Sequence, residues 1–98
     1  MNIQQTKNGN ALTIALEGRL DTLSAPELES VLKEALTGIE DLTIDLDKLD
    51  YISSAGLRVL LSAQKTMTRQ GSMKVSHANE IILEIFEVTG FSDILTIV

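Results

Sequence analysis

Residues 46–61 read LDKLDYISSAGLRVLL, and this stretch joins the end of one expected element to the start of another. Upstream, apolar and polar residues alternate from Leu42 to Asp47, a period of two that predicts a strand with one buried face. Downstream, apolar residues recur at helical spacing from Ser54 to Gly71. The sequence therefore predicts a strand-to-helix junction that carries two adjacent hydroxyls, on Ser53 and Ser54.

The segment before this junction carries further signals of strand and helix. An Asn-Gly pair between two alternating stretches predicts a β-hairpin over residues 1–17. Ser24, with Glu27 three residues later, predicts a helix that begins with a capping box, in which the Ser24 hydroxyl accepts from the backbone of the first turn. Gly38 is a plausible end for this helix.

After the junction, residues 73–77 predict a short strand and residues 79–89 a short helix, while the apolar tail of residues 91–98 must pack as a strand or a short helix. The order β-β-α-β-α-β-α predicts an α/β fold. We expect a mixed sheet of about four to five strands with the α-helices packed mainly on one face. The core should contain Leu12, Ile14, Leu32, Leu36, Leu42, Ile44, Leu57, Leu60 and Leu61.

Composition narrows the function. The 98 residues suffice for one domain, which we expect to span residues 1–98. The net charge of −6 argues against nucleic acid as a partner, because such binding depends on clustered Lys and Arg. No apolar run approaches the length of a membrane span, and there is no cysteine for a disulfide or a thiolate metal site. We expect a cytoplasmic protein, monomeric and without a cofactor.

Catalytic and metal constellations are hard to assemble from these residues. His77 is the single histidine, and neither Ser53 nor Ser54 lies in a Gly-x-Ser-x-Gly elbow. No glycine-rich phosphate loop is present. The acidic residues between Glu40 and Asp50 lack the spacing of a metal-binding loop, which favours a solvated strand face. We therefore expect no enzymatic activity and no bound metal.

The paired hydroxyls at the junction need a different explanation. A single serine at the start of a helix is an ordinary cap and contributes about 1 kcal/mol. The second hydroxyl, and the small Ala55 and Gly56 that follow, suggest a first turn left open to a partner or a modifying enzyme. A helix N-terminus also favours a phosphate, because its backbone N–H groups point outward and its dipole attracts negative charge.

Residues 46–61 resemble the signature of STAS domains, and in particular of the small bacterial anti-sigma factor antagonists. LEGRLDTLSAPEL, with Gly18 and Asp21, is similar to the strand-then-helix opening of this family, and VTGFSDIL to its closing segment. The resemblance covers nearly the whole chain and implies a STAS-type fold.

The resemblance also implies a partner switch. In this family an unphosphorylated antagonist binds an anti-sigma factor that is also a serine kinase, and phosphorylation of the antagonist breaks the complex. A PP2C-type phosphatase restores it. Other members of the family are accessory domains of anion or lipid transport systems, which is the alternative function for this chain.

The resemblance also implies the site residues. Counted back from Gly56, Ser54 matches the phosphoacceptor of the family, Ser53 replaces an aspartate, and Ala55 replaces a second hydroxyl. Ser54 is therefore the expected acceptor and Ser53 the fallback. The surface that binds the partner should contain Asp21, Ser53, Ser54, Gly56 and Arg58, with Arg58 facing solvent.

Overall fold

The computed structural model describes all 98 residues, and its elements follow the predicted order. In chain order, the three α-helices span 11, 17 and 9 residues. The elements are β1 (Asn2–Asn8), β2 (Ala11–Leu20), α1 (Ala25–Ala35), β3 (Asp41–Ile52), α2 (Ser54–Gln70), β4 (Ser72–Ser76), α3 (Glu80–Val88) and the 3₁₀ helix η1 (Phe91–Asp93).

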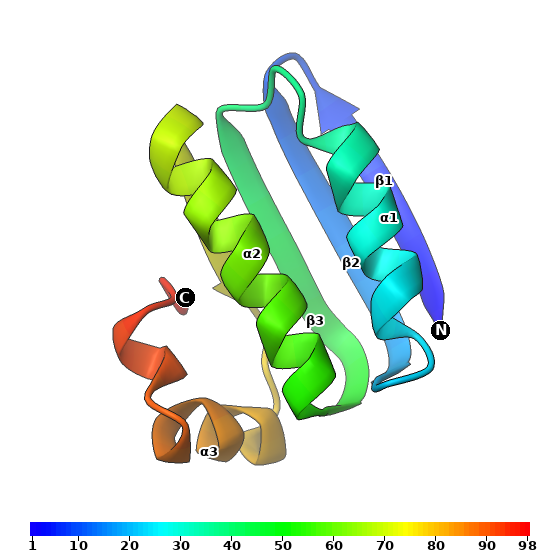
Figure 1. The fold of residues 1–98 in the computed structure, drawn as a ribbon, viewed down its shortest axis with the longest axis vertical. Coiled ribbons are helices and arrows are strands. Elements are labelled where there is room, and N and C mark those ends of the chain that lie inside the picture. The colour runs from blue at the N-terminus through cyan, green and yellow to red at the C-terminus, as the bar shows by residue number, and fades with distance from the viewer.

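The four strands form one mixed sheet in the order β1-β2-β3-β4. The hairpin pair β1–β2 is antiparallel, while β2–β3 and β3–β4 are parallel. Figure 1 shows α1 and α2 lying side by side over one face of this sheet, with α3 beyond its lower end. The predicted α/β architecture is thus confirmed.

A continuous apolar core fills the space between the sheet and the helices. On β2 up to Leu16 and on β3 up to Leu46, every second residue is buried, which is why the alternation of residues 42–47 was informative. Eight of the nine expected core residues are buried, but Leu61 is only half-buried. It lies at the edge of the buried face of α2, in a shallow groove shared with the exposed Ile94, so the prediction for Leu61 was wrong.

Pairing between β2 and β3 sets the position of the candidate site. β3 extends well past Asp47 and remains paired with β2 up to Leu20 and Ile52, through two register irregularities. Because parallel strands run in the same direction, their carboxyl ends and the loops that follow them lie at the same edge of the sheet. The loop before α1 and the junction before α2 are therefore neighbours.

The tail packs as expected of an apolar segment. Leu95 is buried, and Ile97 forms an isolated parallel bridge with Val75 on β4. This contact continues the sheet by one residue pair beyond β4. None of the helices combines the length and the apolarity that crossing a membrane requires.

Candidate functional site

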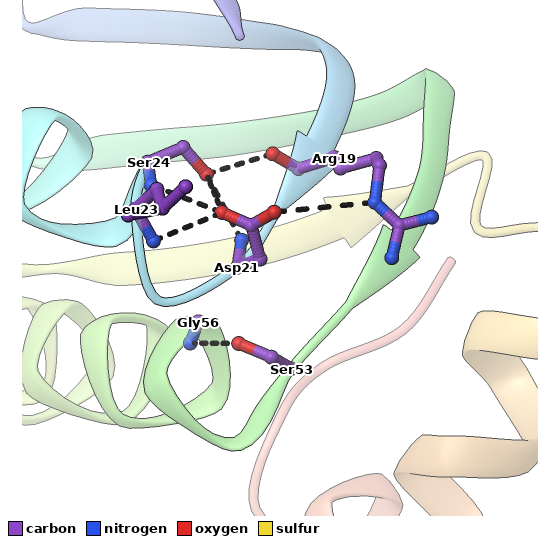
Figure 2. A network of polar contacts seen from close by, with 6 residues as sticks. All are labelled: Arg19, Asp21, Leu23, Ser24, Ser53 and Gly56. Carbon is purple, nitrogen blue, oxygen red and sulfur yellow. Dashed lines mark hydrogen bonds and ion pairs between the residues drawn. The ribbon is translucent and has the colours of Figure 1, made fainter.

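The candidate site lies where β2 and β3 end together. The backbone N–H of Ser53 donates to the carbonyl of Leu20 at 2.8 Å, which ties the junction before α2 to the last residue of β2. Asp21 follows directly, so its loop and the start of α2 lie side by side in Figure 2. The structure thus brings the predicted site residues from the two loops together.

The two serines have different environments. Ser53 is the N-cap of α2: its backbone is extended, and its Oγ accepts from the N–H of Gly56 at 3.4 Å (Figure 2). Ser54 is the first residue of the helix, is exposed, and its hydroxyl forms no hydrogen bond within the chain. One hydroxyl is therefore used by the fold, and the other is available to the surroundings.

Gly56 lies beneath the surface rather than on it. A Cβ atom at this position would lie 2.7 Å from Cγ of Leu20 and 2.9 Å from Cγ1 of Ile52. The glycine therefore lets the first turn of α2 approach the ends of β2 and β3 closely. The expectation that Gly56 keeps the turn open to a partner was wrong, because the residue is buried.

The loop after β2 is organised by Asp21. Its Oδ1 accepts from the backbone N–H groups of Leu23 at 3.0 Å and Ser24 at 3.1 Å (Figure 2). The backbone carbonyl of Asp21 accepts from the backbone N–H of Ala25. The hydrogen bond from the Ser24 backbone, followed by the one from Leu23, lowers the pKa of Asp21 below its ordinary value. The carboxylate therefore shapes the approach to α1 and stays ionised at neutral pH.

The predicted capping box of α1 was wrong. Ser24 has helical rather than extended backbone angles, and its hydroxyl makes no capping bond. The Oγ atom instead donates to the carbonyl of Arg19 at 2.7 Å and accepts from the N–H of Asp21 at 2.9 Å. The carboxylate of Asp21, rather than the hydroxyl of Ser24, accepts the backbone N–H hydrogen bonds before α1, because the chain already turns helically before Ser24.

Two arginines lie near this end of the sheet, and only one of them forms an ion pair. Arg19 is engaged: its Nε is 3.9 Å from Oδ2 of Asp21, and its guanidinium lies 4.7 Å from the ring centre of Tyr51. Arg58 is exposed, as predicted, and takes part in none of the ion pairs of the structure. Its charge is thus uncommitted in the free protein.

Comparison with known proteins connects this geometry to a family. The family described as "Mlab, STAS domain" matches residues 3–97. The chain belongs to the STAS domain family. It is 32% identical to the anti-sigma-B factor antagonist of Bacillus subtilis over 98 residues, which cover 99% of this chain and 90% of that protein.

Solved structures agree on the fold of this STAS domain. An anti-sigma factor antagonist from Mycobacterium paratuberculosis superposes with a TM-score of 0.89 at 18% identity, over 98% of this chain and 83% of that one. The anti-sigma factor antagonist SpoIIAA in its unphosphorylated form gives 0.78 at 14% identity, over 99% and 87%. By sequence and by fold, the chain is a member of the anti-sigma factor antagonists.

One exposed residue of the STAS domain escaped the sequence analysis. Leu23 is 91% exposed, although its own backbone N–H and that of Ser24 donate to the carboxylate of Asp21. Its distance from Leu28 is five residues, outside the helical spacing of three or four that marks a buried face. That mismatch was the available signal that Leu23 faces solvent.

The remaining polar candidates do not join this site. His77 was expected at the end of a strand but lies one residue past β4, and its Nδ1 is 3.0 Å from Oδ1 of Asp45. Asp45 also accepts from the backbone N–H of Asp47, at the first register irregularity between β2 and β3. No cluster of three or more His, Asp or Glu side chains is arranged to hold a metal ion.

Proposed function

We propose that this STAS domain is a phosphorylation-controlled antagonist that binds an anti-sigma factor in the cytoplasm through the surface around Asp21, Leu23, Ser54 and Arg58. Leu23 contributes exposed apolar area, and Arg58 contributes a free cation of the residue type that, with the aromatic residues, is enriched at interfaces. The partner is an anti-sigma factor that is also a serine kinase. A PP2C-type phosphatase removes the phosphate.

The observation that carries the proposal is the separation of the two hydroxyls. Ser54 is exposed at the start of α2 and is not needed for a cap, since Ser53 already supplies one. The first turn of α2 contains no acidic residue, so a negative charge placed there meets the positive end of the helix dipole. Phosphorylation at Ser54 is therefore compatible with the folded state.

The chemical step belongs to the kinase. The Ser54 oxygen attacks the γ-phosphorus of ATP, the bond to the bridging oxygen breaks, ADP leaves, and the serine proton passes to the kinase or to solvent. The antagonist contributes only the nucleophilic hydroxyl and its position. A dianion at the centre of the interface should then lower affinity by about 2–5 kcal/mol, the range for a buried charge left unpaired.

Support for the phosphorylation also comes from the relatives. SpoIIAA, which shares this fold, has been solved in both an unphosphorylated and a phosphorylated form. The Bacillus subtilis relative that is 32% identical to this chain is an anti-sigma-B factor antagonist, which favours this function over the transport-associated alternative.

The test is phosphorylation by the candidate anti-sigma kinase with ATP, read by intact mass and peptide mapping. The wild-type protein and Ser62→Ala, a control at another exposed serine of α2, should gain one phosphate. Ser54→Ala should gain none and remain bound to the kinase, while Ser54→Asp should bind weakly and still fold. Phosphate on Ser53 would move the acceptor to the fallback residue. Failure to modify either serine would refute the switch.

A further inference from the structure

No ion pair within the structure explains the presence of an arginine at position 58. Arg58 is exposed, forms no ion pair, and lies beside the groove between α1 and α2 whose lining includes Glu29, without pairing to that carboxylate. A free guanidinium next to the proposed phosphoacceptor therefore needs an explanation, and the helix geometry provides one.

Ser54 and Arg58 are four residues apart on α2 and are both exposed. Residues at this spacing are neighbours on one helix face, with Cβ atoms about 5–6 Å apart. Side chains in a helix lean toward its N-terminus, so a long side chain at Arg58 extends over the turn that carries Ser54. The acid-before-base order is also the favourable one for a charged pair at this spacing.

Resting on the proposed function, we propose that Arg58 holds the phosphate of phosphorylated Ser54 within the same chain. The guanidinium donates paired N–H bonds to phosphate oxygens, the geometry for which arginine is suited. Phosphorylation then changes the binding surface twice: it adds a dianion, and it withdraws the cation that the unphosphorylated surface offers to the partner.

Arg19, the other arginine that could bind the phosphate, already has partners. Arg19 pairs with Asp21 and stacks on Tyr51, so it would have to leave both partners to reach the phosphate. The other charged groups at this end are the α-amino group of Met1 and the carboxylates of Asp21, Glu27 and Asp50, which line one hollow, and Glu29 on α1. Of the two arginines, Arg58 is thus the one whose recruitment breaks no existing ion pair.

The experiment uses phosphoserine introduced at position 54 during translation, so that it depends on no kinase. The phosphate is titrated by ³¹P NMR in the wild-type background, in Arg58→Gln, and in Arg69→Gln, which removes the same charge from the last turn of α2. A nearby cation stabilises the dianion, so Arg58 should lower the second pKa of the phosphate by about 0.2–0.4 units relative to Arg58→Gln. Arg69→Gln should titrate like the wild type.

A second readout separates contact from general electrostatics. The Nε–H signal of Arg58 should shift on phosphorylation, and Arg58→Lys, which keeps the charge but loses the paired donors, should give an intermediate titration midpoint. Equal midpoints in the wild type and Arg58→Gln would overturn the proposal, whatever the kinase does. If the anti-sigma kinase leaves Ser54 unmodified but the midpoints differ, the proposed function fails and the contact stands.

Discussion

Replacing each serine of the pair by alanine should separate the structural hydroxyl from the available one. Loss of an N-cap side chain costs about 0.5–2 kcal/mol. Because the bond from the Gly56 N–H to Ser53 is long, at 3.4 Å, we expect Ser53→Ala to fall in the lower half of that range. A loss of about 1 kcal/mol would lower the melting temperature by about 4–8 °C in a domain of this size.

Ser54→Ala is the matched control, since it makes the same chemical change one residue away. The Ser54 hydroxyl has no partner in the chain, and alanine is the better helix former by up to about 0.5 kcal/mol, so this variant should be neutral or slightly more stable. Urea denaturation followed by circular dichroism measures both. Equal destabilisation by the two variants, or a larger loss for Ser54→Ala, would refute the assignment of the cap to Ser53.

Five further predictions concern the surroundings of the site. Gly56→Ala should destabilise in urea unfolding, because the overpacking cost of about 1–3 kcal/mol outweighs a helix-propensity gain of at most about 1 kcal/mol; a more stable variant would contradict the close approach. Asp21→Ala should melt below Asp21→Asn, which keeps an accepting oxygen. The pKa of Asp21 is lowered in the folded state, so its ionised carboxylate should stabilise the fold at pH values above the ordinary pKa of an aspartate. This stabilisation should be lost as the pH falls through the pKa of the folded state. If the wild type remained more stable than Asp21→Asn in strong acid, this reasoning would be contradicted. Leu60→Ala should cost about 2–5 kcal/mol in urea unfolding and Leu61→Ala clearly less, so equal losses would restore Leu61 to the core. Leu23→Asp should weaken binding to the anti-sigma factor at an unchanged melting temperature, and unchanged binding would remove Leu23 from the surface.

The fold could be predicted because the sequence repeats its buried positions regularly. On β3 the alternation continues for as long as the strand pairs on both sides, and on α2 the buried residues follow the helical period. Leu61 fits that period but lies at its edge, in a shallow groove whose lining includes Ile94 of the tail. A periodic pattern identifies the centre of a buried face better than its margin.

The candidate site was predicted in place but not in detail. The sequence brings Asp21 and Ser54 to one edge through the parallel pairing of β2 and β3, which follows from the element order. It does not reveal that the chain turns helically before Ser24, and this turn moves the accepting role from Ser24 to Asp21. Such exchanges between nearby polar side chains depend on backbone angles that composition does not determine.

The same separation of roles would let the proposed switch operate without unfolding the domain. A modification that consumed the hydroxyl of Ser53 would remove the cap of α2, whereas one at Ser54 leaves that cap intact. The first turn is also fixed from below, because Gly56 seats it closely against Leu20. In the proposed switch, added charge at Ser54 would therefore act on the outer surface, where Arg58 forms no ion pair, and would change the affinity for the partner rather than the stability of the fold.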